Sequence, residues 1–277
     1  MRQRIRARFP RFQFITEERG MSSEYTSLVC VVQGPVARIT LNRPPLNILN
    51  IAMLQELNSA LDSLKSNVDA KLLVIDHEGR AFSAGVDIKD HTADKVELMI
   101  EVLHRMFQLL GALELPTLAV VKGAALGAGC ELAAFCDLVI ASEQATFGLP
   151  EIKVGVFPPI ATAILPHLIG RNRALELILT GETVGAEEAK QMGLINRVFP
   201  AEGFREKADE FIAKLTTLSA PVLKLAKQAV DRGLYVSVDE ARSIADEIYL
   251  GELMRTEDAQ EGLKAFMEKR KPEWKNR

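Results

Sequence analysis

The sequence is poor in cysteine and histidine, the residues that form disulfides and hold many structural metals. Its 277 residues include three cysteines, Cys30, Cys130 and Cys136, and four histidines, at no spacing typical of a metal site. An odd, irregular set of cysteines argues against a disulfide framework and predicts a reducing compartment, the cytoplasm. We interpret the thiols as small buried hydrophobic groups and expect no bound metal.

Long apolar runs and a basic charge excess are also lacking. No stretch reaches the roughly 18–20 apolar residues that span a bilayer, and the most apolar region, 115–132, contains Lys122 and several glycines. The net charge is −3, but residues 1–20 hold six arginines and two glutamates, a local +4 that leaves −7 for the rest. The lack of a spanning run predicts no membrane among the partners, and a body that acidic predicts no nucleic acid. We interpret residues 1–24 as a disordered basic extension, or as an upstream extension of the reading frame.

The hydrophobic pattern predicts an α/β core over residues 25–210 and a helical C-terminal region over 211–277. Predicted strands cover 27–33, 36–41, 71–75, 117–121 and 138–141, with helices over 51–66, 93–113 and 130–135. The segments 78–90 and 123–129 are predicted loops. Later helices are predicted over about 159–169, 171–180, 186–192, 203–217, 220–232 and 236–270.

Two segments rich in small residues, 81–89 and 123–131, each follow a predicted buried strand. Small residues let a ligand approach the backbone closely. Two converging N–H groups can then bind a developing oxyanion, and one at a helix N-terminus gains from the helix dipole. The alternative is that these residues only permit tight packing between strand, turn and helix.

Two glutamates stand in apolar surroundings. Glu131 lies at the start of an apolar helix, and Glu151 follows the run Phe147-Gly148-Leu149-Pro150. Burial raises the pKa of a carboxyl group and makes it a useful proton donor near neutral pH, so two such groups could divide acid and base roles. The alternative is one helix-start glutamate and one turn glutamate, both solvated.

Four fragments, in order, resemble the enoyl-CoA hydratase/isomerase (crotonase) family, and the resemblance covers about residues 26–275. The fragments are 84–89, 123–137, 147–155 and 262–271. The resemblance implies a crotonase-like spiral of ββα units with a helical C-terminal trimerisation region. It also implies a homotrimer or homohexamer that acts on a coenzyme A thioester, with no cofactor besides the coenzyme A of the substrate.

The resemblance also implies roles for individual residues. The N–H groups of Val86 and Ala128 would hold the thioester oxygen, Glu131 would activate water, and Glu151 would exchange a proton with the α-carbon. Contacts to coenzyme A are implied, from the same or a neighbouring subunit, for Leu46, Ala84, Asp87, Ile88, Lys89, Phe266 and Lys269. The implied activity is hydration of a conjugated enoyl-CoA or dienoyl-CoA.

The sequence departs from the family pattern after Gly155, where the family usually has a glycine-rich run. Here the segment contains Phe157, Pro159 and Ile160, which we predict to line the acyl pocket. This run resembles hydratases of aromatic compound degradation that act on cyclohexa-1,5-diene-1-carbonyl-CoA. The alternatives are a short-chain enoyl-CoA hydratase of fatty-acid β-oxidation, an isomerase or ring-opening hydrolase, and an RNA-binding homologue that uses the basic residues 1–20.

Overall fold

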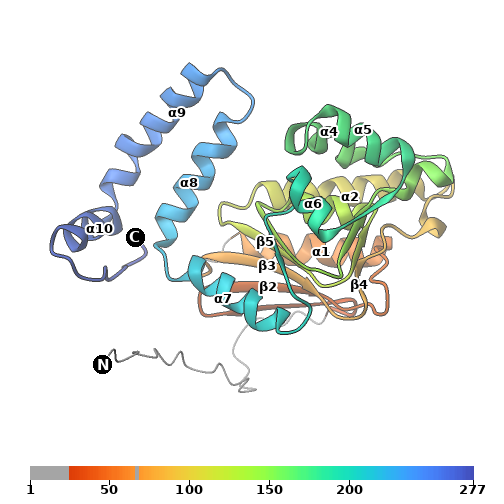
Figure 1. Cartoon of the computed structure of the whole chain (residues 1–277), viewed down its shortest axis with the longest axis horizontal. Coiled ribbons are helices and arrows are strands. Elements are labelled where there is room, and N and C mark those ends of the chain that lie inside the picture. Colours follow the sequence, from red (N-terminus) through yellow and green to blue (C-terminus); the bar gives the residue numbers. More distant parts are fainter. Residues whose placement is uncertain (1–24, 66–68) are drawn as a thin grey trace, which may run out of the picture.

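The computed structural model describes residues 25–65 and 69–277, so the predicted basic extension over 1–24 lies outside the described residues. Its larger sheet has the order β1-β2-β3-β5-β7-β10, and Figure 1 labels its strands β2, β3 and β5. These strands are β1 (Leu28–Gln33), β2 (Val36–Leu41), β3 (Leu72–His77), β5 (Thr117–Val121), β7 (Leu138–Ser142) and β10 (Arg197–Phe199). The pair β1–β2 is antiparallel and the other neighbours are parallel, which confirms the predicted α/β core.

A second, smaller sheet has the order β4-β6-β8-β9. Its strands are β4 (Ala81–Ser83), β6 (Ala124–Leu126), β8 (Thr146–Gly148) and β9 (Thr183–Gly185). The prediction of 78–90 and 123–129 as plain loops is therefore wrong, because each contains a strand. Strands of three residues are too short to show a period of two in the sequence. This sheet matters for function because β4 and β6 lie in parallel beside each other.

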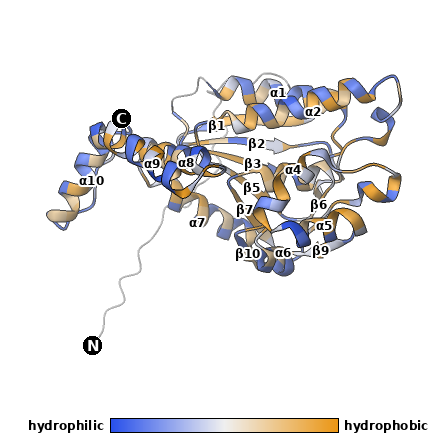
Figure 2. Ribbon diagram, turned by 90° about the horizontal axis from the view of Figure 1, so that it is seen from above, coloured by the Kyte–Doolittle hydropathy of each residue, from blue (hydrophilic) through white to orange (hydrophobic). Residues whose placement is uncertain are grey.

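The two faces of β3 show how the core is divided. Leu73 and Ile75 belong to the main core, with helices α1 (Ile51–Leu64) and α2 (Val96–Gly111). Leu72 and Val74 point to the other face, where they pack with α7 (Phe204–Thr216) (Figure 2). The alternation follows from the two-residue period of a strand. Because α7 packs on the sheet, the predicted domain boundary at 210/211 falls inside a helix of the core.

Short helices connect the two sheets and the C-terminal region. They are α3 (Ala128–Phe135), the 3-10 helices η1 (Ile88–Asp90) and η2 (Pro150–Val154), α4 (Pro159–Leu168), α5 (Arg171–Thr180) and α6 (Ala186–Met192). The predicted helices over 159–169, 171–180 and 186–192 are confirmed. Cys130 and Cys136 are buried and Cys30 is half-buried.

The C-terminal region consists of α8 (Ala220–Gly233), α9 (Val238–Gly251), η3 (Leu253–Arg255) and α10 (Glu257–Met267). The prediction of one helix over 236–270 is wrong, because the chain breaks at η3. Thr256 then caps α10 by accepting a hydrogen bond from the N–H of Ala259. In both views α8, α9 and α10 extend to one side of the sheets (Figures 1 and 2).

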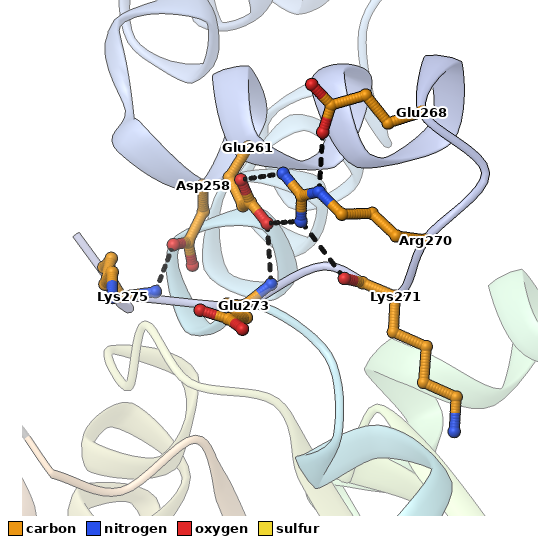
Figure 3. Close-up of polar contacts among 7 residues, drawn as sticks. All are labelled: Asp258, Glu261, Glu268, Arg270, Lys271, Glu273 and Lys275. Atoms are coloured by element: carbon orange, nitrogen blue, oxygen red, sulfur yellow. Dashed lines mark hydrogen bonds and ion pairs between the residues drawn. The ribbon is translucent and has the colours of Figure 1, made fainter.

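The last ten residues fold back along α10 (Figure 3). Arg270 forms ion pairs with Glu261 and Glu268. The fully buried carboxylate of Asp258 accepts a hydrogen bond of 2.6 Å from the N–H of Lys275. The indole of Trp274 donates to the carbonyl of Thr217 at the end of α7. The tail therefore connects α10 to the junction of α7 and α8.

Within the described part of the chain, every helix is too short or too polar to cross a membrane. The same residues contain no group of three or more His, Cys, Asp or Glu side chains placed to hold a metal ion.

Candidate active site

The two small-residue segments meet where β4 and β6 end. The strands lie in parallel, so their carboxyl ends reach the same edge of the smaller sheet. A Cβ atom on Gly85 would lie 3.6 Å from the nitrogen of Ala128 and 3.6 Å from the Cα of Gly127. The loop after β4 and the start of α3 are thus in van der Waals contact, as the oxyanion hypothesis requires.

The orientation of the Val86 N–H is fixed by the segment that precedes α1. The carbonyl of Gly85 accepts a hydrogen bond of 2.9 Å from Leu49, and Asp87 donates one of 3.1 Å to the carbonyl of Leu49. A peptide group is planar, with its C=O and N–H pointing in opposite directions. Because the Gly85 carbonyl points to Leu49, the Val86 N–H of the same peptide points away from it.

The Ala128 N–H is fixed in the same way. The Gly127 carbonyl accepts a hydrogen bond of 3.0 Å from the N–H of Glu131, so the Ala128 N–H of that peptide points out of the N-terminus of α3. The first N–H groups of a helix have no partner within the helix, and the dipole favours an anion there. Gly127 has φ 54° and ψ −129°, a conformation that only glycine adopts readily.

Glu131 lies in the first turn of α3 and is 1% exposed. Its Oε1 accepts hydrogen bonds from the N–H groups of Ile160 (2.9 Å) and Ala161 (2.8 Å), in the first turn of α4. Burial raises the pKa of Glu131 to about 7, and the charge of Glu151 adds to the rise, although the two N–H groups oppose it. The alternative of a solvated Glu131 is wrong, because the apolar start of α3 is buried under α4.

Glu151 lies in η2, half-buried, on the other side of Gly127. A Cβ atom on Gly127 would lie 2.6 Å from the Oε1 of Glu151. Among residues 25–65 and 69–277, no group donates a hydrogen bond to its buried Oε2. Burial raises the pKa of this carboxyl above its ordinary value. Two carboxyl groups with raised pKa values therefore belong to this site, Glu151 against Gly127 and Glu131 within reach of the charge of Glu151.

The alternative that the small residues serve tight packing is also correct at some positions. A Cβ atom on Gly129 would lie 2.5 Å from the carbonyl oxygen of Ser83. Gly129 therefore lets α3 sit against β4. Packing and N–H orientation depend on the same close approach.

The residues predicted to contact coenzyme A fall into two groups. Leu46 and Ala84 are joined by a hydrogen bond of 2.9 Å from the Ala84 N–H to the Leu46 carbonyl. Asp87 caps η1 by accepting from the N–H of Lys89, and the side chains of Lys89 and Ile88 are exposed beside it. These residues lie next to Val86.

The second group lies on α10. Phe266 is 83% exposed, and Lys269 follows the helix with φ 56°. Helix α10 lies beyond α8, away from the smaller sheet (Figure 1). The fold therefore does not bring these two residues to Glu131 and Glu151 of the same chain.

The predicted acyl-pocket residues lead into α4. Pro159 is the first residue of that helix, and Ile160 supplies one of the N–H groups that bind Glu131. Pro159 and Ile160 are half-buried, whereas Phe157 is 63% exposed. The segment is thus physically joined to Glu131.

Asn47 is a residue that the sequence pattern did not single out. It is fully buried, has φ 49°, and its side chain makes three hydrogen bonds to backbone groups. An asparagine shortly before a helix is typically its N-cap, and Asn50 has that role in α1. The sequence pattern therefore gives no sign of a separate role for Asn47.

The fold and this geometry define an α/β enzyme that combines two oriented N–H groups with two carboxyl groups of raised pKa. The family model for enoyl-CoA hydratase/isomerase matches residues 32–277. The chain belongs to this family. It is a hydro-lyase of the enoyl-CoA hydratase type with the crotonase fold, and its substrate class is the acyl-CoA thioester.

Similar proteins cover nearly the whole chain. A probable enoyl-CoA hydratase of Rhizobium meliloti is 38% identical over 91% of this chain and 99% of its own length. A short-chain-enoyl-CoA hydratase of Clostridium acetobutylicum is 35% identical over 92% of this chain and 100% of its own. A crystal structure of an enoyl-CoA hydratase from Bacillus anthracis superposes with a TM-score of 0.86 at 33% identity, covering 91% of this chain and 100% of that one.

Proposed function

We propose that this enzyme hydrates a conjugated enoyl-CoA thioester, with Glu131 as the base that activates water and Glu151 as the acid that protonates the α-carbon. The observation that carries the proposal is that the two carboxyl groups lie close enough for the charge of Glu151 to raise the pKa of Glu131, with the peptide of Gly127 and Ala128 beside them. The Glu151 carboxylate lies against Gly127, and the backbone of Glu131 orients the N–H of Ala128.

The proposed reaction begins when the N–H groups of Val86 and Ala128 bind the thioester oxygen. Glu131, ionised, takes a proton from water while the water oxygen forms a bond to the β-carbon. The π electrons move to the thioester oxygen, where the two N–H groups stabilise the developing enolate. Each such donor typically contributes about 3–4 kcal/mol to the transition state.

The reaction ends when Glu151, protonated, gives its proton to the α-carbon and the thioester carbonyl re-forms. The resulting charge states, protonated Glu131 and ionised Glu151, are reset by exchange with water. Both pKa values are raised by burial, which keeps one proton available to the pair near neutral pH. General acid and base groups of this kind each contribute about 10²–10⁴-fold to the rate.

The test replaces each glutamate with glutamine and follows crotonyl-CoA hydration by loss of the conjugated absorption. We expect Glu131→Gln and Glu151→Gln each to lower kcat by about 10²–10⁴-fold. Glu143→Gln is the matched control, because the Glu143 carboxylate also accepts a backbone N–H, from Ala201, but lies outside the site. Undiminished hydration in both active-site variants would refute the roles.

For the acyl group we propose the ring of cyclohexa-1,5-diene-1-carbonyl-CoA. The support is the run through Phe157, Pro159 and Ile160, whose stiff, bulky residues stand where the family usually has glycine and connect directly to Glu131. A linear short-chain enoyl-CoA is the second candidate, supported by the similarity to the Clostridium enzyme.

The two acyl candidates are separated by measuring kcat/KM for the dienoyl thioester and for crotonyl-CoA on the same preparation. A higher value for the dienoyl thioester supports the ring. A higher value for crotonyl-CoA supports the chain and overturns the ring.

We also propose a homotrimer or homohexamer in which Phe266 and Lys269 contact coenzyme A bound to a neighbouring subunit. The support is the distance of α10 from the site and the exposure of large apolar side chains on α8–α10, among them Val238 (85%), Phe266 (83%) and Met267 (75%). Exposed apolar area of this kind marks an interface. Light scattering after gel filtration tests the assembly, and a monomer at working concentration would overturn it.

A further inference from the structure

We propose that Asn47 is a positioning residue, which holds the loop that presents the Val86 N–H to the thioester oxygen. This inference rests on the proposed function. Asn47 lies in the loop before α1, and its side chain is fully buried. A buried amide keeps its place only if its hydrogen bonds are satisfied, so its partners define what it does.

The partners of Asn47 belong to two separate loops. Its Oδ1 accepts a hydrogen bond of 2.8 Å from the Arg43 N–H, which closes its own loop. Its Nδ2 donates to the carbonyls of Glu78 (2.7 Å) and Ala81 (2.8 Å), at the entrance to β4. One side chain thus joins residues 43–47 to the segment that leads to Val86.

The side-chain bonds continue a set of backbone bonds between the same segments. Ala84 donates to Leu46, and Leu49 donates to the Gly85 carbonyl. The last of these bonds fixes the peptide that contains the Val86 N–H. Asn47 lies between Leu46 and Leu49 in the sequence. A shift of its backbone would therefore move both the Leu46 carbonyl and the Leu49 N–H that form these bonds.

The backbone of Asn47 explains why the position suits this residue. Its φ of 49° lies in the left-handed region, which asparagine tolerates better than most residues. Glycine would accept the same φ without the side-chain bonds. Aspartate would keep the Oδ1 acceptor for Arg43 but would place a second oxygen against the carbonyls of Glu78 and Ala81.

These differences define the experiment. Asn47→Gly removes the three bonds without backbone strain, and Asn47→Asp makes two of them repulsive at nearly constant volume. Asn58→Ala is the matched control, because Asn58 also donates its amide to a backbone carbonyl, that of Val102, between α1 and α2. All three variants and the wild type are measured for kcat and KM with crotonyl-CoA, per folded protein determined by circular dichroism.

We expect kcat/KM to fall by about 10–100-fold in both Asn47 variants, since a misplacement near 1 Å can reduce a rate 10²-fold. The fall should appear mainly in kcat, and Asn58→Ala should keep wild-type kinetics even where its unfolding temperature falls. Kinetics within threefold of wild type in folded Asn47→Gly or Asn47→Asp would overturn the inference. Should one of the two fail to fold, the other decides.

A second readout does not depend on turnover. Dimethylaminocinnamoyl-CoA has an electron-donating amine conjugated with its thioester carbonyl. Hydrogen bonds to the thioester oxygen favour the polarised form of this chromophore and should move its absorption to longer wavelength, so the red shift reports how well the two N–H groups are placed. We expect a smaller shift in both Asn47 variants and an unchanged shift in Asn58→Ala. A wild-type enzyme that shows the shift but hydrates nothing would refute the proposed function and leave the inference standing. An equal shift in all four proteins would overturn the inference.

Discussion

Replacing Gly127 by alanine tests the geometry of the site at the point where its parts meet. The added Cβ would lie 2.6 Å from the Oε1 of Glu151 and 3.6 Å from the Cα of Gly85. It would also stand on a backbone with φ 54° and ψ −129°, a conformation that L-residues avoid at a cost of about 1–3 kcal/mol. The peptide therefore has to rotate, and the Ala128 N–H rotates with it.

The expected magnitude follows from the loss of one oxyanion donor, about 3–4 kcal/mol, or about 10²–10³-fold in kcat. Displacement of the Glu151 carboxylate adds to this, so we expect a fall of at least 10²-fold. The assay is kcat for crotonyl-CoA hydration, together with thermal unfolding to establish that the variant is folded. KM should change much less than kcat, because the residues proposed to contact coenzyme A do not include Gly127 or Ala128.

Gly170→Ala is the control that separates strain from function. Gly170 also has a glycine-only backbone, with φ 80° and ψ 152°, but a Cβ there meets nothing within 4 Å. We expect it to lower the unfolding temperature and leave kcat unchanged. If folded Gly127→Ala hydrates crotonyl-CoA within threefold of wild type, the assignment of Ala128 as an oxyanion donor is refuted.

Three further predictions concern stability. Burial raises the pKa of Glu131 in the folded chain to about 7, so the free energy of unfolding of the wild type falls as pH rises through that value. Glutamine does not ionise. Glu131→Gln should therefore be more stable than wild type at pH 8, by on the order of 3 kcal/mol, but not at pH 4. Burial lowers the pKa of His77 to about 4, and its Nε2 accepts from the Lys122 N–H. The contribution of His77 to stability should therefore be lost as pH falls from 6.5 to 4, opposite in sign to that of Glu131, so His77→Gln should gain stability relative to wild type over that range of a urea-unfolding series. Asp258→Ala leaves two tail N–H groups without their acceptor, so it should destabilise the chain by about 1–3 kcal/mol and shift the fluorescence of Trp274, the single tryptophan.

Much of the fold could be predicted from the sequence, because a long helix or strand contains enough residues to show its hydrophobic period. The face of α1 with Met53, Leu54, Leu57 and Leu61 repeats at helical spacing, which predicts the helix, and the structure buries that face. The strands of the smaller sheet could not be found, since three residues show no period. The break before α10 did carry a signal, because Thr256 followed by two acidic residues is typical of a helix start.

Only the local features of the candidate site, its loops rich in small residues and its two glutamates, could be predicted from the sequence. The apolar run around Glu131 left a buried and a solvated carboxylate both open, and no local pattern predicts that the N–H groups of Ile160 and Ala161, about 30 positions away, would bind it. Asn47 was missed for the same reason. Its partners Glu78 and Ala81 are more than 30 positions away, and such contacts depend on the tertiary structure.

Hydration that requires both Glu131 and Glu151 is the central claim, and isotope incorporation tests it most directly. Crotonyl-CoA is turned over in heavy-oxygen D₂O, and the product is analysed by mass spectrometry and NMR. The account predicts one heavy oxygen at the β-carbon and one deuterium at the α-carbon, with both incorporations slowed in Glu131→Gln and in Glu151→Gln. Deuterium at the α-carbon without heavy oxygen at the β-carbon would show an isomerase and contradict the account.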